Sequence, residues 1–437
     1  MYAAIIGKKL VELTNQNAKK KLSAKEFWKE IFIPLFFDDQ KYLLSGGNTP
    51  LENPKISWEK KKYPTPEERT KRIEAIKKNI ESGVPDTSNS LVAGSSDLEA
   101  TTSGQITSFK LPLSQEEIYA SWIGVGLGVR VEGGFVILFD KEEIIKLLFE
   151  GWQKYRELVN DTTNLKGNQI ETWNGHWLTF ALGNANYQKE LFVPPFKLDK
   201  SVGKIETQGW IKVLFALARQ FPNEKLNVYI CSLGQTNTTV GFIKINLPEI
   251  KREIEMYDYL FGELKDVGKR AIDEVYNTQF AFRTACQNGI IGLQEIQPKT
   301  LREYFPQRKK EGTLPKIKSD EKSIINYNIY LSWVLAMLNN KTTIQTAEET
   351  AKVLQEYVAT TSSRAKKTQA INVDTLLEST TRKVFIENTI DILKDNPSKS
   401  EFFNRLVEEI DKMQADKYPY FLTLVKFKYA YLNTKKS

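Results

Sequence analysis

Residues 128–139 read GVRVEGGFVILF and decide the fold class of this 437-residue chain. Polar and apolar residues alternate up to a glutamate and two glycines, and an unbroken apolar run follows. Glycines between two strand-forming runs are typical of a tight turn, so the stretch predicts a β-hairpin. Residues 141–159 come next and are rich in leucine, isoleucine and aromatic residues, which predicts a helix. A hairpin followed by a long helix indicates mixed α and β structure.

The chain around this hairpin shows the same mixture of patterns. A helix is predicted from about Thr207 to Arg219. Further strand-like runs lie at 176–182, 226–232 and 239–246. We therefore predict an irregular mixed α/β body over residues 109–312.

Directly before the hairpin, residues 124–128 read GVGLG. The dinucleotide-binding fingerprint needs a third glycine at the position of Val129, and a helix rather than a strand after it. We interpret the segment as a glycine-rich entry to a strand or a place of close backbone contact, and we expect no cofactor.

The last part of the chain has a helical pattern and follows the linker-like stretch LPKIKSDEK. Amphipathic segments separated by polar or proline-containing joints lie at 324–339, 344–360, 371–394 and 400–431. Four such helices predict a four-helix-type bundle over residues 323–437. The predicted fold class is therefore α+β, with the mixed body preceding the bundle.

The first part of the chain combines helices with irregular segments. Helices are predicted at 23–37, which starts at a serine cap, and at 65–80, which has proline in its first turn. We treat residues 1–83 as a helical and irregular N-terminal region. Residues 84–108 are small and polar and cannot bury enough surface to fold alone, so they predict a flexible polar tether.

The charge balance favours binding over catalysis. Lysine and arginine outnumber aspartate and glutamate by 62 to 54, and the chain has one histidine, His176. Histidine titrates near neutral pH and is the commonest metal ligand, so this composition offers few routes to acid/base or zinc chemistry. His176 lies between Trp173 and Trp177, and we interpret it as a packed histidine or a neighbour of a stacked base rather than a catalyst. A positive balance attracts polyanions, which suggests nucleic acid as the partner.

The location signals favour the cytoplasm. Cys231 and Cys286 have no CxxC spacing, and a reducing compartment suits them. The first lysines follow the N-terminal apolar run, the wrong order for a signal peptide. No stretch reaches the roughly 20 apolar residues of a membrane helix, so we expect no membrane partner.

Several polar loops carry amide side chains on a glycine-containing backbone. They include Ser103-Gly104-Gln105, Gly167-Asn168-Gln169 with Asn174-Gly175, and the segment from Ser232 to Thr239. Amides can form paired hydrogen bonds with base edges, and hydroxyl groups can hold phosphates. The candidate recognition residues are Asn48, Gln105, Gln235, Asn237 and Thr238. The alternative is that these segments are ordinary turns.

Three basic clusters lie in the second half of the chain. They are Arg302 with Arg308, Lys309 and Lys310; Arg364, Lys366 and Lys367; and Arg382 with Lys383. The middle cluster falls in a joint between two predicted helices, where long cationic side chains can reach a phosphate backbone. Tyr304 and Phe305 adjoin the first cluster as candidate stacking surfaces. The alternative is that these residues form solvated faces.

The order of these regions resembles the large subunits of type I CRISPR effector complexes (Cascade), in particular those with a small-subunit-like helical bundle at the C-terminus. The resemblance is architectural. It rests on the mixed body with polar loops, the tether, and the terminal helical region that ends KYPYFLTLVKFKYAYLN. The chain is shorter than many members, which leaves the subtype open.

The resemblance implies a non-catalytic subunit that contacts guide RNA, reads a short motif beside a double-stranded DNA target and stabilises the opened strands. The other effector subunits and a recruited helicase-nuclease would be its partners. Motif recognition would then fall to Gln235, Asn237 or Asn48. The terminal basic residues, Arg364 to Lys367 and Arg382 to Lys383, would hold the backbone.

Two alternatives remain. Asp39, Glu59 and Lys61 follow the order of a PD-(D/E)xK site, in which carboxylates hold Mg²⁺ beside a lysine, so the chain could be a restriction-type DNA endonuclease. It could also be a structural adaptor whose basic surface has no function.

Overall fold

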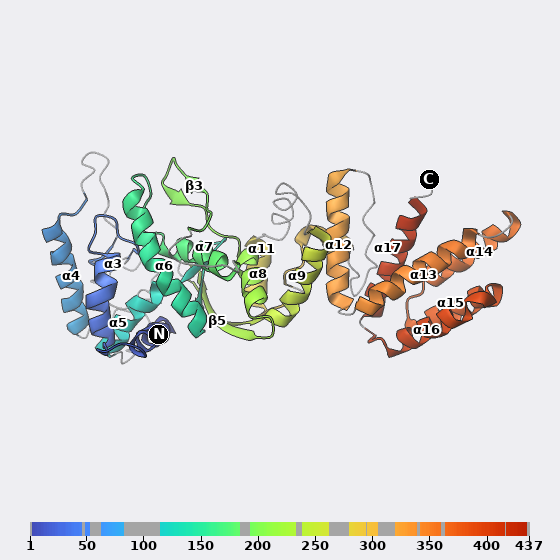
Figure 1. Cartoon of the computed structure of the whole chain (residues 1–437), viewed down its shortest axis with the longest axis horizontal. Helices are drawn as coiled ribbons and strands as arrows, with labels where there is room; N and C mark the ends of the chain where they lie inside the picture. The colour runs from blue at the N-terminus through green and yellow to red at the C-terminus, as the bar shows by residue number, and fades with distance from the viewer. Residues whose placement is uncertain are drawn as a thin grey trace. The chain divides into compact units, whose positions relative to one another are not determined.

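The protein is described by a computed structural model whose helices and strands are shown in Figure 1. The structure describes residues 2–45, 49–52, 63–82, 114–183, 193–232, 238–261, 279–293, 295–304, 320–338, 341–359, 363–415 and 417–434. The chain forms two compact units. Unit 1 comprises Met1–Ile250 and Gln279–Glu295, and unit 2 comprises Lys251–Thr278 and Ile296–Ser437. Unit 1 contains helices and a sheet and unit 2 is helical, which confirms the predicted α+β class.

The centre of unit 1 is a five-stranded sheet with the order β1-β2-β5-β6-β7. Its strands are β1 (Val129–Val131), β2 (Phe135–Phe139), β5 (Lys225–Ser232), β6 (Thr238–Asn246) and β7 (Ile290–Ile291). β7 runs parallel to β6, and the other neighbours pair antiparallel. The predicted hairpin is confirmed as β1 and β2, and its turn contains Gly133 and Gly134 at positive φ of 94° and 76°. Only glycine adopts such angles at little cost.

Helices precede, separate and follow these strands along the chain. They are α1 (Tyr2–Asn15), α2 (Ala24–Phe27), the π-helix η1 (Trp28–Phe32), α3 (Ile33–Phe36), α4 (Pro66–Glu81), α5 (Gln115–Val125), α6 (Glu142–Asp161), α7 (Ile170–Gly183), α8 (Trp210–Gln220), α9 (Leu247–Phe261) and α11 (Gln279–Gln287). The predicted helix at 23–37 is the continuous run α2-η1-α3, and Ser23 and Glu26 form a capping box at its start. The boundary between the two units falls within α9.

Two glycines allow α1 and α5 to pack backbone against backbone. A Cβ atom added at Gly124 would overlap the carbonyl oxygen of Ala3, and one at Gly7 would overlap the carbonyl oxygen of Ala120. The first glycine of the GVGLG segment is therefore a place of close backbone contact, one of the two interpretations that the sequence left open.

The prediction of a strand at 176–182 was wrong, because these residues belong to α7. Every residue from Ile170 to Leu178 is buried. A helix that is enclosed on all sides has no polar face, so its apolar residues do not recur at a helical period and the run resembles a buried strand.

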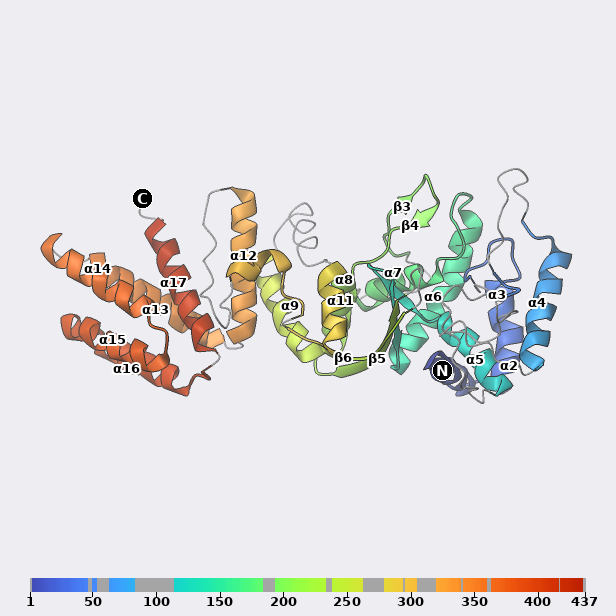
Figure 2. The ribbon, with the colours of Figure 1, turned by 180° about the vertical axis from the view of Figure 1, so that it is seen from behind.

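A second, small sheet consists of β3 (Leu198–Asp199) and β4 (Lys204–Ile205). Its hairpin projects beside the C-terminal end of α6, as Figures 1 and 2 show. The backbone of Lys166 donates to the carbonyl of Gly203 at 3.0 Å and fixes the hairpin to the loop that follows α6.

Unit 2 is helical, as predicted; the first two predicted segments correspond to single helices, and the last two are each interrupted. Its described elements include the 3₁₀ segments η3 (Lys299–Tyr304) and η4 (Pro397–Lys399) and the helices α12 (Glu321–Leu338), α13 (Lys341–Ala359), α14 (Ser363–Leu377), α15 (Arg382–Asp395), α16 (Ser400–Lys412) and α17 (Tyr418–Thr434). The predicted segment 371–394 is interrupted where Thr381 caps α15, and 400–431 is interrupted before Pro419 in the first turn of α17. None of the helices in the described ranges is long and apolar enough to cross a membrane.

Candidate nucleic-acid interface on the sheet

One face of the sheet is open over β5, β6 and β7. Residues that pair directly across strands, and those two apart along a strand, point to the same face. Tyr229 pairs with Phe242, and Lys244 pairs with Ile290. By this register the open face carries Lys225, Asn227, Tyr229, Phe242, Lys244 and Ile290.

The two faces of these strands differ sharply in burial. Phe242 is 63% exposed and Ile290 is 51% exposed, whereas Val228 and Ile245 on the other face are fully buried. On the β2 side the face that carries Tyr229 is covered, since Leu138, its cross-strand partner, is 1% exposed. An exposed aromatic ring beside a covered apolar region marks a surface that is available to bind a ligand.

Three aromatic rings meet where the covered part of this face ends. Tyr2, in the first turn of α1, lies with its ring centroid 5.2 Å from that of Tyr229 and 4.9 Å from that of Phe242. The centroids of Tyr229 and Phe242 are 5.3 Å apart. Such contacts hold the rings in place, so the surface that they present is preorganised for stacking.

The charges on the open face favour an anionic partner. The strands β5 and β6 contain no aspartate or glutamate, and the exposed Lys225 and Lys244 lie on the same face as Phe242. Burial and the charge of Asp140 raise the pKa of Tyr2 to about 12. Tyr2 is therefore a neutral aromatic surface at physiological pH.

Gly241 precedes Phe242 in β6 and marks an irregularity in the β5–β6 register. It has a φ of 107°, and apart from its chain neighbours no atom lies within 4 Å of the position that its Cβ would occupy. Glycine at a bulge lets a ligand approach the backbone closely.

Lysines, an exposed aromatic ring and an open backbone position together suit single-stranded nucleic acid. Every base has a π-face that stacks on aromatic side chains, and lysines attract the phosphates that connect the bases. A duplex keeps its bases stacked inside and does not offer them to such a surface.

The amide loop predicted from the sequence falls between β5 and β6 along the chain. Gln235 and Asn237 are outside the described residues, and Thr238 is the first residue of β6. The other predicted positions outside the described residues are the 84–108 tether, Asn48, Gln105, Glu59, Lys61, Arg308, Lys309 and Lys310.

The predicted amide positions near Gly167 and Asn174 serve internal contacts. Gln169 donates to the carbonyls of Lys166 at 2.7 Å and Gly203 at 3.2 Å, and its Oε1 accepts from the Ile205 N–H at 2.8 Å. Asn174 lies in α7 rather than in a loop. Its Nδ2 donates to the carbonyls of Gly126 and Gly128 at 2.8 and 2.9 Å, which fixes the GVGLG segment. The prediction of a loop at Asn174-Gly175 was wrong.

The basic clusters of unit 2 lie on helices. Arg302 is in η3, and Arg364, Lys366 and Lys367 are in α14, not in a joint between helices as predicted. Lys367 is exposed, and Lys383 is exposed and 3.7 Å from Glu387.

Arg382 is half-buried, and its Nη1 donates to the carbonyls of Asp411 and Met413. Arg382 thus caps the end of α16.

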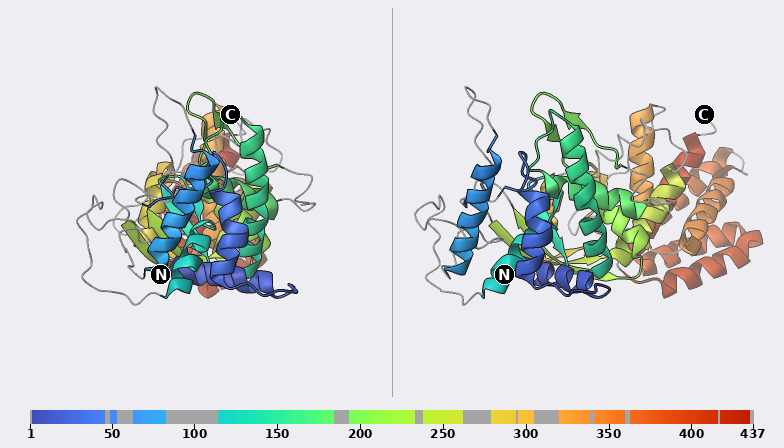
Figure 3. Two further views of the ribbon diagram at one scale, coloured as in Figure 1. Left: turned by 90° about the vertical axis from the view of Figure 1, so that its left-hand side faces the viewer. Right: turned by 60° about the vertical axis from the view of Figure 1, so that its left-hand side comes forward.

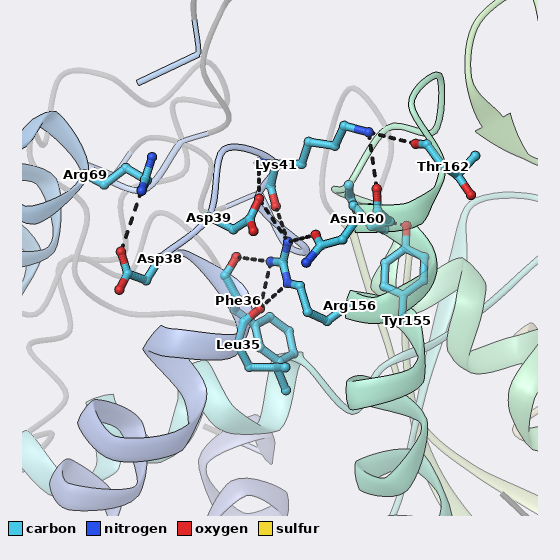
Figure 4. A network of polar contacts seen from close by, with 12 residues as sticks. Leu35, Phe36, Asp38, Asp39, Lys41, Arg69, Tyr155, Arg156, Asn160 and Thr162 are labelled. Atoms are coloured by element: carbon cyan, nitrogen blue, oxygen red, sulfur yellow. Dashed lines mark hydrogen bonds and ion pairs between the residues drawn. The ribbon is translucent and has the colours of Figure 1, made fainter. Parts of the chain in front are cut away.

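Asp39, from the predicted endonuclease set, belongs to a polar network around Arg156 (Figure 4). Its carboxylate lies 3.4 Å from the Arg156 guanidinium and accepts the Lys41 backbone N–H at 3.1 Å. Arg156 also donates to the carbonyls of Leu35 and Lys41, at 2.7–2.9 Å and 2.9 Å. The described residues contain no cluster of three histidine, cysteine or acidic groups suited to hold a metal.

The same network caps two helices reciprocally. Arg156, on α6, satisfies carbonyls at the end of α3, where a positive charge is favoured by the helix dipole. Lys41, in the segment after α3, donates its ammonium to the carbonyls of Val159, Thr162 and Thr163 at the end of α6. The network therefore ties the N-terminal helices to α6.

His176 is a packed histidine, one of the two roles expected from the sequence. It lies in α7, is 7% exposed, and its Nε2 is 2.7 Å from the carbonyl oxygen of Glu206. Burial lowers the pKa of His176 below its ordinary value, and the hydrogen bond to Glu206 opposes part of this shift.

This depressed pKa predicts a pH dependence of stability. As the pH falls below about 6.5, the unfolded chain takes up a proton that folded His176 resists, so the free energy of unfolding should decrease. One group contributes a slope of at most about 1.4 kcal/mol per pH unit. His176→Gln should remove this component, which urea unfolding at about pH 7.5 and 5.5 measures. If the free energy of unfolding falls by the same amount in the unmodified chain and in His176→Gln, the pH dependence does not come from His176.

The sequence prediction missed the residues that define the open face. Tyr2, Tyr229 and Phe242 lie in apolar runs that were interpreted only as core strands or a short apolar terminus. One signal was available: residues 225–230 read KLNVYI, in which Lys225, Asn227 and Tyr229 alternate with leucine, valine and isoleucine. That alternation is typical of a strand with one solvent-facing side.

Comparison of the chain with models of known protein families finds no match, and neither curated proteins nor solved structures give one.

Proposed function

We propose that the protein binds single-stranded nucleic acid on the open face of its sheet. The observation that carries this proposal is Phe242, which is 63% exposed, contacts Tyr2 and Tyr229, and shares its face with Lys225 and Lys244. Bases stack on the rings, and the lysines hold the phosphates that join them.

The Cascade large subunit is the more specific form of this proposal and rests on the architectural resemblance. Along the sequence, the amides Gln235 and Asn237 fall between the two strands that carry the open face, and amide side chains can pair with base edges. Co-purification of the chain with a guide RNA and further subunits tests this form.

Phe242→Ala should weaken binding of a short single strand about 5- to 150-fold, since stacking on one aromatic ring contributes about 1–3 kcal/mol per base. The change should leave stability nearly unaffected, because most of the ring is exposed. Fluorescence anisotropy of labelled oligothymidylate and oligouridylate measures the dissociation constants.

Two variants serve as controls. Phe242→Tyr keeps an aromatic ring and should retain binding, and Val202→Ala removes an exposed apolar side chain (43% exposed) from the β3–β4 turn. If Phe242→Ala binds as tightly as Val202→Ala, or if the unmodified chain retains no single strand at low salt, the proposal is wrong.

A further inference from the structure

The loop that follows α1 presents three consecutive lysines, Lys19, Lys20 and Lys21, all of them exposed. One side chain closes this loop. The Asn15 Nδ2 donates to the Leu22 carbonyl at 2.8 Å, and its Oδ1 accepts the Leu22 N–H at 2.9 Å. A side-chain amide that bridges the two ends of a loop fixes its backbone, so the lysines project from a defined support.

Two of these lysines are available to an external anion. Lys20 lies 2.9 Å from Glu30 and 4.0 Å from Glu26. In the described part of the chain, no carboxylate lies within ion-pair distance of Lys19 or Lys21. Two unneutralised lysines separated by one residue attract phosphate groups.

The helix α1 connects this loop to the open face. Tyr2 is its first residue and contacts Phe242, and Asn15 is its last and closes the lysine loop. At 1.5 Å per residue, the 14 residues of α1 span about 21 Å. Figure 3 shows α1, in dark blue, with the loop at the end away from the N-terminus. Lys8 and Lys9 lie along the helix, 3.4 Å from Glu117 and 2.7 Å from Asp140.

We infer that a strand bound on the open face continues along α1 and that Lys19 and Lys21 hold its phosphate backbone at the far end. This inference rests on the proposed function and adds a second contact at a defined distance. At a stacked, duplex-like spacing of about 3.4 Å per nucleotide, a span of about 21 Å corresponds to about six nucleotides. Strands shorter than this reach only the open face, and longer strands reach both places.

The test is a length series. Labelled oligothymidylates and oligouridylates of about 4 to 15 nucleotides, the range of site sizes of single-strand binders, are titrated with the full chain at several salt concentrations. The tighter-binding series is then repeated with the double variant Lys19→Ala/Lys21→Ala. Lys71→Ala/Lys78→Ala, on the exposed side of α4, removes the same charge from the same unit and is the matched control.

We expect the affinity of the unmodified chain to increase in a step at about six to eight nucleotides, where a strand first reaches the loop. The loop variant should lack this step and should bind the shortest strands normally. Its slope of log K against log salt on long strands should be smaller by about 1.4, or about 0.7 for each lost phosphate contact. The α4 control should keep both the step and the slope.

The outcomes separate the two proposals. Suppose that Phe242→Ala weakens the binding of short strands, but the loop variant binds strands of every length as tightly as the unmodified chain. The path along α1 is then wrong, and the open-face proposal stands. If the α4 control loses as much affinity as the loop variant, the effect is one of general charge and the path is again wrong. If short strands bind independently of Phe242, the open-face proposal itself fails.

Discussion

Gly124→Ala should lower the free energy of unfolding of unit 1 by about 3 kcal/mol, the upper end of the usual cost of overpacking, because it inserts a methyl group where two helix backbones touch. The added Cβ would overlap the carbonyl of Ala3, and its next neighbours are also backbone atoms of that residue. A flexible side chain could move aside at small cost, but here α1 and α5 must separate. Since α1 carries Tyr2 to the open face, the variant should also weaken nucleic-acid binding.

Gly183→Ala is the matched control for this change. Gly183 is the last residue of α7, and no atom lies within 4 Å of its added Cβ. Alanine there should leave stability unchanged or raise it by up to about 1 kcal/mol through the entropy of the unfolded chain. Urea unfolding monitored by tryptophan fluorescence compares the two variants. Equal midpoints for them would show that α1 and α5 are not in backbone contact.

Arg156→Met should lower the free energy of unfolding by about 3–5 kcal/mol. This is the range seen when one partner of a buried ionic cluster is removed. Methionine keeps most of the side-chain volume but leaves the carbonyls of Leu35 and Lys41 without their donor and Asp39 without its cation. Each buried acceptor left unsatisfied costs about 1–3 kcal/mol. The end of α3 would then lose its connection to α6.

Arg283→Met provides the comparison, since Arg283 is an exposed arginine on α11 of the same unit. Surface substitutions of this kind change stability by less than about 0.5 kcal/mol. Chemical denaturation measures the change in the free energy of unfolding for each of the two variants. A loss for Arg156→Met no larger than that for Arg283→Met would mean that the network in Figure 4 is not formed.

Local signals explain why part of the fold could be predicted. The Gly133-Gly134 turn, the capping residue Ser23 and the alternation along β5 each depend on neighbours in sequence. The strand interpretation of 176–182 failed because α7 is enclosed on all sides, and its enclosure depends on distant segments. Thr381 is a typical N-cap residue and begins a new helix, α15. The sequence on both sides has a helical pattern, so the segment was predicted as one continuous helix.

The candidate interface was predicted only in part. The sequence pointed to the segment between β5 and β6 because of its amides, Gln235 and Asn237, whereas the structure points to the open face of the strands themselves. Whether one side of a strand is open or covered depends on which helices pack over it. Leu138 and Phe242 lie on the same face, yet the first is buried and the second exposed. No property of either residue alone distinguishes them.

Photo-crosslinking tests the central claim most directly. A single strand that contains 5-iodouridine is bound to the full chain, irradiated, and the modified peptides are identified by mass spectrometry. We expect crosslinks at Tyr229 or Phe242 for strands of about four nucleotides, because bases stack on these rings. Crosslinks confined to the helices of unit 2, or unchanged by Phe242→Ala, would contradict it.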